Sequence, residues 1–429
     1  MKETFLYYLW EYYFSGKIIT IKENQQVKII HPGFRNEDSG PDFFNAKIFL
    51  NGTLWAGNIE IHVNSSNWYR HGHQEDVNYN NVILHVVYNC DKPVYRKNNE
   101  EIPCLELKGR FNESLYRTYQ KYILSPDWIP CANDIQRAGF FKIYQWLERM
   151  AFERIERKTN DILAQTKNSK GDLLNAFYRK FFRSFGMRTN GDAFEHLAIT
   201  LPLPVIAKHS DSLIQLEALL FGQAGFLNEE KNDPYYIKLK KEYFFLSQKY
   251  GLTALPKHTW KFMRMRPSNF PSIRIAQLAF LFYKSPDMLT QILNADTPGK
   301  VIHFLESGVS EFWFTHYTFD KIHSRKAKKI GKETIYSIII NSVIPFLFAY
   351  GQMINDEKIQ NKGMKWLEDI PPENHTVSRH FAEIGVQPLN AVQTQGMLEL
   401  KLFYCDASRC LECAIGHQLI SSSQDINIL

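Results

Sequence analysis

Short runs of alternating apolar and polar residues, separated by turn residues, fill the chain up to about residue 109. Between residues 59 and 63, Ile59, Ile61 and Val63 alternate with Glu60 and His62, which is the period of a β-strand with one buried face. An Asn-Gly pair at 51–52 precedes this run and is typical of a hairpin turn. The pattern predicts an amphipathic helix and then four strands, at residues 3–14, 27–31, 44–50, 53–63 and 82–89.

Longer helical periodicity replaces this pattern after about residue 124. Prolines at 126 and 130 break the chain there, and residues 112–122 have the pattern of a connecting helix. We therefore expect an α/β domain at 1–124, with a mixed sheet and flanking helices, and a large all-α domain at 125–429. Helices of the second domain are expected at 143–164, 173–185, 204–221, 236–250, 273–283, 288–294 and 333–352.

The longest apolar run, residues 335–353, has the length of a membrane span. Ser337, Asn341, Ser342 and Pro345 interrupt it, so we expect a buried helix with a kink at the proline. The first residues lack the basic, apolar and small-residue parts of a signal peptide. We expect a cytoplasmic protein with reduced thiols and no membrane partner.

Composition narrows the function classes only slightly. Apolar residues make up 44% of the chain and charged residues 22%, which are ordinary shares for a soluble globular protein. A net charge of +6 and a pI near 8.7 are compatible with a nucleic-acid partner and do not demand one.

The segment from Gly40 to Val63 carries the most informative chemistry. Glu60 and His62 point to the same face of their strand, and pairing through the hairpin turn would bring Asp42 to the same edge. Two carboxylates that meet repel each other unless a proton or a cation lies between them, so the pattern indicates a divalent metal site. The alternative is that Glu60 and His62 are the solvent-exposed face of an edge strand.

Pro41-Asp42 and Glu60-Ile61-His62 resemble the core motif of the PD-(D/E)XK nuclease superfamily, with histidine where lysine is usual. The resemblance implies the restriction-endonuclease-like fold, whose core runs helix, strands, helix, strand. It also implies that Asp42 and Glu60, with a backbone carbonyl near Ile61, hold magnesium or manganese against the scissile phosphate of DNA. His62 would then contact the attacking water or the phosphate.

The chain as a whole resembles a family of bacterial proteins known only as a domain of unknown function. This resemblance spans nearly the full length and implies no activity. The segments that carry it are GPDFFNAKI, TLWAGNIEIHV, NWYRHGH, NVILHVVY, RMRPSNFPSIRIAQL and YCDASRCLECAIG.

Four further residues near the motif are candidates. His71 and His73, on either side of a glycine, could bind a phosphate or a second metal, and the alternative is a pair of loop histidines that cap the next helix. His85 lies in an apolar strand and is expected to be a core residue with satisfied hydrogen bonds. Glu11 lies on the first helix, where it could approach the metal, but the sequence gives no specific evidence that it does.

A second candidate site lies at the C-terminal end. Cys405, Cys410 and Cys413 have the spacing C-x4-C-x2-C, at which three thiolates can converge on one cation. Cys131 is the first choice for a fourth ligand and His417 the second, and either set suits structural zinc or an iron–sulfur cluster. The alternative is three small buried thiols in a C-terminal helix.

Three arginines, Arg264, Arg266 and Arg274, surround a predicted helix start at Ser272. Guanidinium groups and free backbone donors suit phosphates, so we consider a nucleic-acid contact here. The alternative is that these arginines pair with acids across a helix interface.

Two hypotheses about function follow. The first is metal-dependent hydrolysis of DNA phosphodiester bonds in the first domain, with the helical domain positioning the duplex or a protein partner. The second is a non-catalytic module on a degenerate nuclease fold that binds nucleic acid or protein. A third, less favoured, makes the cysteines a metal or redox sensor. The sequence does not indicate an oligomeric state.

Overall fold

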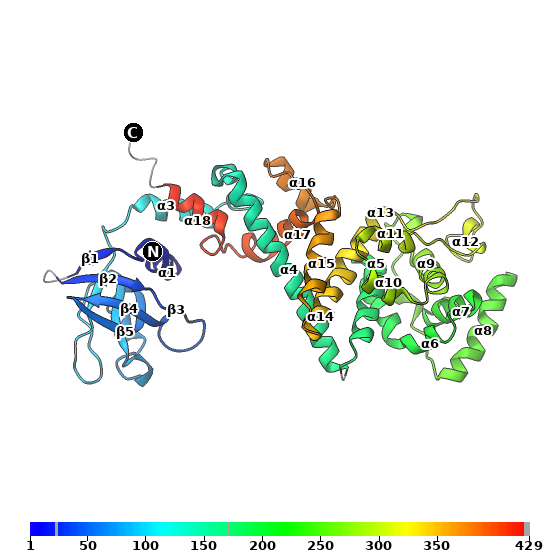
Figure 1. The fold of residues 1–429 in the computed structure, drawn as a ribbon, viewed down its shortest axis with the longest axis horizontal. Coiled ribbons are helices and arrows are strands. Elements are labelled where there is room, and N and C mark those ends of the chain that lie inside the picture. The colour runs from blue at the N-terminus through cyan, green and yellow to red at the C-terminus, as the bar shows by residue number, and fades with distance from the viewer. Residues whose placement is uncertain (22–24, 170, 424–429) are drawn as a thin grey trace. The chain divides into compact units, whose positions relative to one another are not determined.

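A computed structural model describes residues 1–21, 25–169 and 171–423. Its contacts divide the chain into two compact units: Met1–Ile143 together with Leu402–Leu429, and Tyr144–Lys401. This division differs from the expected domains at 1–124 and 125–429, because the C-terminal segment packs against α3 (Glu113–Ile123) and the 3₁₀ turn Ile135–Ala138 of the first unit. In Figure 1 the C-terminal helix α18 (Ala414–Ser421, red) lies beside α3.

A mixed sheet of seven strands forms the centre of the first unit (Figure 1). Its order is β1-β2-β4-β5-β6-β7, and β3 pairs with β4. The strands β2, β4 and β5 form an antiparallel meander, whereas β6 and β7 continue the sheet from β5 in parallel. The strands are β1 (Ile18–Thr20), β2 (Gln26–His31), β3 (Phe34–Arg35), β4 (Phe43–Leu50), β5 (Thr53–Asn64), β6 (Val82–Asn89) and β7 (Cys104–Glu106).

The four predicted strands are confirmed as β2, β4, β5 and β6. The strands β1, β3 and β7 have only two or three residues each, which is too short to give a readable alternation. The predicted first helix is present as α1 (Glu3–Tyr8), which continues into a π-helical turn, Leu9–Tyr13. Its apolar residues are buried, and α1 packs against β5.

The strand β5 is central, because β4 and β6 cover both of its edges. Glu60 and His62 are only 4% and 2% exposed. The alternative of a solvent-exposed face on an edge strand is therefore wrong. Gly57 allows the close approach of β5 to β6, since a Cβ there would lie 2.7 Å from the carbonyl oxygen of Asn81.

The connection from β5 to β6 contains the short helix α2 (Asn67–Arg70) and a 3₁₀ turn, Val77–Tyr79. Trp68 and Tyr79 anchor this connection in a small apolar cluster with Val82, Val94 and Ile102. The two loop histidines lie between these anchors, so the loop is held against the sheet by apolar burial.

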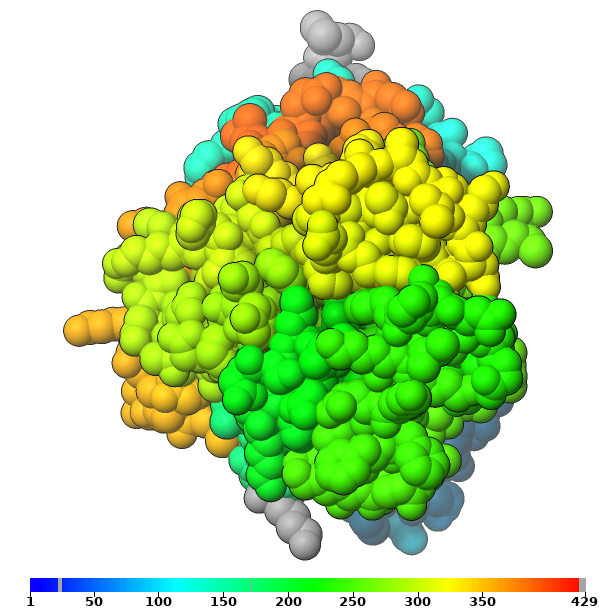
Figure 2. All heavy atoms as spheres, turned by 90° about the vertical axis from the view of Figure 1, so that its right-hand side faces the viewer, coloured from blue at the N-terminus to red at the C-terminus, as the bar shows by residue number. Residues whose placement is uncertain are grey.

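The second unit is built from helices around one large apolar core, as expected (Figure 1). Figure 2 shows the face of this unit to which α7 and α8 (green) and the segment of α12 (yellow) contribute. The helix α4 begins in the first unit and continues into the second. The helices are α4 (Phe140–Asn168), α5 (Leu173–Thr200), α6 (Leu203–Ala207), α7 (Leu213–Gln223), α8 (Pro234–Tyr250), α9 (Pro271–Lys284), α10 (Met288–Asn294), α11 (Pro298–Leu305), α12 (Phe312–Thr315), α13 (Lys332–Ile338), α14 (Ile344–Met353), α15 (Glu357–Asp369), α16 (Thr376–Glu383) and α17 (Ala391–Glu399).

Two of the expected helices differ in detail. The single helix expected at 204–221 is two helices, α6 and α7, because a turn of small polar residues at 210–212 interrupts it. The apolar stretch Lys332–Met353 is long and apolar enough to cross a membrane, but 78% of its most apolar window is buried inside the structure. It is a core element of the second unit. A π-helical turn, Ile339–Val343, precedes Pro345 and is where the helix changes its hydrogen bonding.

Candidate metal centre

Asp42 and Glu60 meet where β4 begins beside the middle of β5. The backbone N–H of Asp42 donates to Glu60 Oε2 at 3.2 Å, and the N–H of Ile61 donates to Asp42 Oδ2 at 2.8 Å. A bulge after Phe43, where Asn45 has a φ of 56°, lets the chain turn Asp42 toward β5. The structure thus brings the two carboxyl groups together, with the Ile61 N–H facing Asp42 in place of the carbonyl that the resemblance implies.

Neither carboxyl group has a cationic partner among the described residues. Burial raises the pKa of Glu60 to about 8, and burial together with repulsion by Glu60 raises the pKa of Asp42 to about 7. Tyr7 on α1 donates its hydroxyl to Asp42 Oδ1 at 2.8 Å, and Glu3 on the same helix adds negative charge near both groups. The pair therefore holds protons near neutral pH unless a cation displaces them.

Three imidazoles converge on this acidic pair. His62 Nε2 and His73 Nε2 lie 3.4 Å and 3.2 Å from Glu60 Oε1, and His62 Nε2 is 3.1 Å from His71 Nδ1. One nitrogen from each of the three histidines lies within 4.8 Å of the others. His73 Nε2 is buried and makes no hydrogen bond within the described part of the chain. A metal ion at this point would bind the buried nitrogen of His73 and would account for the short separations between the donor atoms.

The three imidazoles are neutral at pH 7. Burial lowers the pKa of His62 to about 2, and the neighbouring imidazoles add to this shift. Burial also lowers the pKa values of His71 and His73. A neutral imidazole is the form that binds a metal, so the site is ready to accept a cation without first losing protons from nitrogen.

Residues behind the three imidazoles fix their orientation. His62 Nδ1 lies 2.9 Å from Nε2 of His85, which is fully buried, so the prediction that His85 is a core residue is confirmed. Its Nδ1 makes no hydrogen bond within the described part of the chain, so the expected satisfaction of both nitrogens is not found. The ring of Tyr79 stacks on His73 with centroids 3.9 Å apart, and Trp68 lies edge-on to the same ring. Contacts of this kind usually position the ligands of a metal.

The sequence analysis missed Glu3, Tyr7 and Tyr79. Glu3 and Tyr7 are four residues apart on α1, and this spacing alone could have marked a polar side of the helix that faces the motif. Nothing in the sequence around Tyr79 connects it to His73. Glu11 interacts with Tyr12 and Arg35 and is absent from the groups that act on Asp42 or Glu60.

The donor set fits a transition metal. Ligands at about 2.0–2.1 Å from a tetrahedral metal lie about 3.3 Å from one another. The separations among Glu60, His62, His71 and His73 are 3.1–3.4 Å where contacts are formed. Three imidazoles at tetrahedral spacing are typical of zinc. Of the two metals that the sequence indicates for this site, manganese accepts imidazole ligands more readily than magnesium.

The cysteines form a second cluster within the first unit. Burial and the neighbouring thiols of Cys413 and Cys410 raise the pKa of Cys131, and burial with Cys413 raises that of Cys410 to about 12. Cys405 ends a π-helical turn, and a loop separates it from Cys413 at the start of α18. The three thiols therefore do not lie in one helix, although Cys410 and Cys413 are buried as that alternative expects. His417 instead packs edge-on against two tyrosines of the first helix and turn.

The three arginines of the second unit have different environments. Arg264 and Arg266 are exposed in the segment before α9. Arg274 is only 3% exposed, and its guanidinium donates to side chains of Gln277, Asn269 and Thr334 inside the unit. The prediction that Arg274 contacts nucleic acid is wrong, because its helix turns this side chain into the interior.

Comparisons with known proteins identify the family of the chain but not a chemical activity. No curated protein and no solved structure matches the chain. The comparisons give no support to the PD-(D/E)XK resemblance. A family model described as "Protein of unknown function (DUF2851)" matches residues 3–376. This match contains all of the acidic and histidine residues of the candidate metal centre, and the cysteine segment at 404–416 lies beyond it. Because the match covers most of both units, the chain belongs to the DUF2851 family of proteins of unknown function.

Proposed function

We propose that the first unit is a metal-dependent hydrolase that cleaves phosphodiester bonds in DNA. The observation that carries the proposal is the convergence of Glu60, His62, His71 and His73 beside the buried acid Asp42. Buried acids and imidazoles without counter-charges are costly to a fold, and such groups cluster at functional sites.

Each group in the site has a role in this proposal. Glu60, His62 and His73 would hold the metal, and His71, which is exposed, would complete the set or contact the substrate. In the tautomer that leaves His62 Nε2 free for a metal, its Nδ1–H donates to His85. The metal would supply a positive charge that polarises the phosphate and lowers the pKa of water.

Asp42 is the best candidate for the proton acceptor. It is only partly buried, and its pKa of about 7 is close to that of an efficient general base at neutral pH. Tyr7 and the Ile61 N–H hold one oxygen each, so the carboxyl group has a fixed direction. This proposal transfers to Asp42 the role that the sequence motif assigned to His62.

The order of elements supports a nuclease over other hydrolases. Asp42 directly precedes β4, and Glu60 lies on β5. The helix α1 precedes the meander β2–β4–β5, and β6 joins in parallel after a connection with a short helix. This is the order of helix, strands, helix, strand that the restriction-endonuclease-like resemblance implies. The net charge of +6 is compatible with a polyanionic substrate.

The test is cleavage of linear and circular DNA, single- and double-stranded, with manganese or magnesium chloride. We would compare the wild type with Glu60→Gln, which keeps the size of the side chain and removes its charge. Glu37→Gln is the matched control, because Glu37 is exposed and lies outside the site. We expect manganese-dependent cutting that falls by about a hundredfold or more in Glu60→Gln, since contacts behind the ligands alone are worth about 10–100-fold.

Each other outcome rejects part of the proposal. Cutting that is unchanged in Glu60→Gln would come from a contaminant or from another site. An absence of cutting with either metal, combined with DNA binding, would favour the non-catalytic module. Calorimetric titration of wild type and of Glu60→Gln with manganese shows whether the variant has lost metal binding or has kept it and lost only cleavage.

A further inference from the structure

A basic pocket in the second unit has no part in the proposed hydrolysis. It has a volume of about 600 Å³ and lies between α4, α5 and the segment of the π-helical turn at 339–343. Six of its lining residues are cationic and one, Asp161, is acidic. The cationic residues are Arg154, Arg157, Lys158, Lys180, Arg183 and Arg188.

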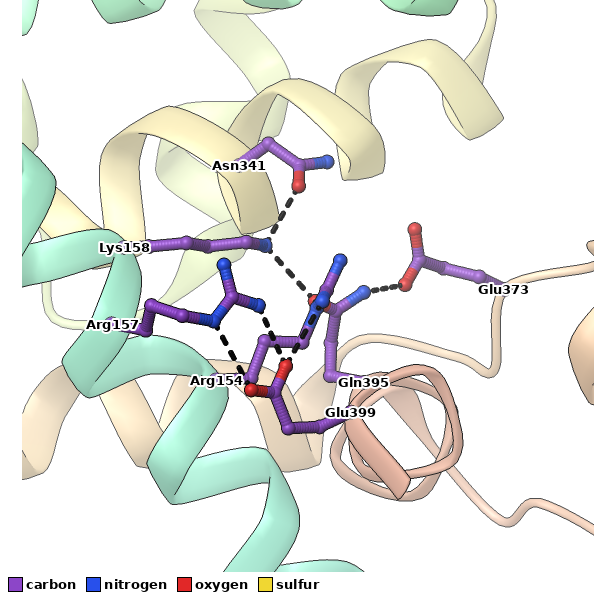
Figure 3. A network of polar contacts seen from close by, with 7 residues as sticks. All are labelled: Arg154, Arg157, Lys158, Asn341, Glu373, Gln395 and Glu399. Atoms are coloured by element: carbon purple, nitrogen blue, oxygen red, sulfur yellow. Dashed lines mark hydrogen bonds and ion pairs between the residues drawn. The ribbon is translucent and has the colours of Figure 1, made fainter. Parts of the chain in front are cut away.

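Two of the arginines share a single carboxylate at one side of the pocket (Figure 3). Arg157 donates to both oxygens of Glu399, at 3.1 Å and 2.7 Å, and Arg154 Nη1 donates to Glu399 Oε2 at 3.1 Å. Glu399 is 4% exposed. One buried carboxylate therefore holds two guanidiniums in a fixed arrangement.

Lys158 adds a further cation that faces neutral groups. Its ammonium donates to Asn341 Oδ1 at 2.8 Å and to Gln395 Oε1 at 3.0 Å (Figure 3). The Gln395 amide in turn donates to Glu373, so this acid contacts the amide and not the ammonium. Within the described residues Lys158 has no ion pair. Burial, and to a lesser degree the neighbouring arginines, lower the pKa values of Lys158 and Arg154, while Glu373 and Glu399 act in the opposite direction.

The other side of the pocket is formed by α5 where its backbone is strained. Met187 has φ 51° and ψ −149° within α5, a conformation that costs a non-glycine residue about 1–3 kcal/mol. Arg188 follows it, is exposed, and forms no ion pair in the part of the chain that the structure describes. Lys180 lies 3.9 Å from Asp161, and Arg183 is paired with two acids of its own helix. Arg188 is thus a free cation at the pocket.

We propose that this pocket binds the phosphate groups of a nucleotide unit. Guanidinium forks match phosphate oxygens in pairs, and a phosphate would bring negative charge to a pocket whose lining holds six cationic residues and one acid. The volume exceeds that of a single inorganic anion and falls in the range of about 300–1,000 Å³ that is usual for small-molecule sites. A nucleic-acid strand and a free nucleotide both supply this unit, and the phosphate chemistry is the same in both.

The test measures binding to the full-length protein by calorimetry and fluorescence anisotropy. The probes are pyrophosphate, ATP and a fluorescein-labelled single-stranded oligonucleotide. The variants are Arg188→Gln and Lys158→Met, and Lys238→Gln is the charge-matched control because Lys238 is exposed on α8, outside the pocket. We expect Arg188→Gln and Lys158→Met to weaken binding by about tenfold or more and Lys238→Gln to leave it unchanged.

The results separate the sources of the phosphate and can overturn the proposal. Tight binding of the oligonucleotide alone assigns the pocket to a strand, and binding of ATP or pyrophosphate assigns it to a free nucleotide. Failure of every probe to bind, or equal losses in Lys238→Gln and the two pocket variants, overturns the proposal. If Lys158→Met fails to fold, Arg188→Gln decides, because its side chain is exposed. The probes should also bind to Glu60→Gln with unchanged affinity, which would show that the pocket acts independently of the candidate metal centre.

Discussion

At the scale of single residues, His62 is where the first unit departs most from the nuclease motif. A lysine at this position would bring a fixed positive charge, whereas His62 is buried and neutral between Glu60, His71 and His85. Its two nitrogens face different partners, one toward the acids and one toward His85. This arrangement suits a ligand held in one tautomer better than a group that moves a proton.

A first prediction concerns His85. His85→Phe removes the acceptor of the His62 Nδ1–H and should weaken Mn²⁺ binding by about 10–100-fold, because such outer contacts fix the orientation of a ligand. His85→Gln keeps a side-chain acceptor and should recover part of the loss. Calorimetric titration of the metal-free protein with MnCl₂ measures both. Equal affinities in wild type and His85→Phe would show that His62 does not bind the metal.

A second prediction at this scale concerns Glu217, which is buried in the second unit. Ser310 Oγ donates to its Oε1 at 2.5 Å, and burial raises its pKa to about 7. In the unfolded chain the carboxyl group ionises near pH 4.3, about the ordinary value for glutamate. The folded state therefore holds a proton that the unfolded state releases, and stability falls as pH rises from about 4.3 to about 7.

Glu217→Gln should remove this pH dependence. The contribution of Glu217 to the free energy of unfolding should fall over that range by up to about 3 kcal/mol, since one pKa unit corresponds to about 1.4 kcal/mol. Asp42 and Glu60 also have raised pKa values and add a decrease that is common to wild type and Glu217→Gln. Urea unfolding at about pH 5 and about pH 8 measures the difference. Glu368→Gln, at an exposed position of α15, is the control and should behave as wild type. An unchanged slope in Glu217→Gln would contradict the prediction.

Residue patterns predicted the acidic pair but not its surroundings. Asp42 and Glu60 could be placed together because a hairpin turn fixes the pairing of two neighbouring strands. The approach of His85 to the site depends on the register of β6 against β5, in which Glu60 and His85 are partners. Two strands joined by a long connection have no turn to set that register, so it could not be read from the sequence.

At the scale of elements, patterns gave the long strands and helices and missed the irregular ones. The bulge in β4, the π-helical turn before Pro345 and the break in α5 at Met187 all interrupt a regular period. Each irregularity sets a local geometry. The bulge turns Asp42 toward β5, the π-helical turn accommodates Pro345, and the break in α5 leaves Arg188 at the pocket. Local propensity does not encode such directions, because they depend on the packing partners.

The cysteine cluster joins two elements of the first unit, the turn around Cys131 and the start of α18. We expect purified protein to contain zinc or iron, and Cys131→Ser to lose it together with thermal stability, since a metal-bound thiolate ties these segments. Metal analysis and visible absorption distinguish zinc from an iron–sulfur cluster. Cys90→Ser is the control, because Cys90 is not among the groups that raise the pKa values of Cys131 and Cys410. Wild-type protein without either metal would leave Cys131, Cys410 and Cys413 as buried thiols only.

At the scale of the whole molecule, the C-terminal segment returns to the unit with which the chain begins. The Ser114 hydroxyl at the start of α3 donates to the carbonyl of Ser423, and α18 packs on α3 and on the 3₁₀ turn Ile135–Ala138. The sequence predicted one boundary because the change from strands to helices is visible. It could not predict the return, because α18 has the same helical pattern as the helices before it and its partners lie about three hundred residues away.

The return predicts what happens when the chain is shortened to end at Lys401. Ile415, Leu419 and Ile420 are at most 1% exposed, and each such side chain contributes about 1.5–3 kcal/mol by its burial. Their combined loss approaches the net stability of about 5–15 kcal/mol of a typical domain, so the first unit should unfold locally or completely. Ile420→Ala should have a smaller effect, about 2–5 kcal/mol.

Hydrogen–deuterium exchange separates the two units in this experiment. Peptides from β4, β5 and β6 should exchange faster in the shortened chain, because their protection depends on an intact first unit. Peptides from α7 and α9 should keep their protection, because their core residues belong to a separate cluster that contains none of the deleted residues. Faster exchange in both sets would mean that the two units fold as one cooperative block, and unchanged exchange in the sheet would mean that α18 adds nothing to its stability. The ligands of the candidate metal centre lie on β5 and in the connection from β5 to β6, so the first result would also make manganese binding depend on a helix that contributes no ligand.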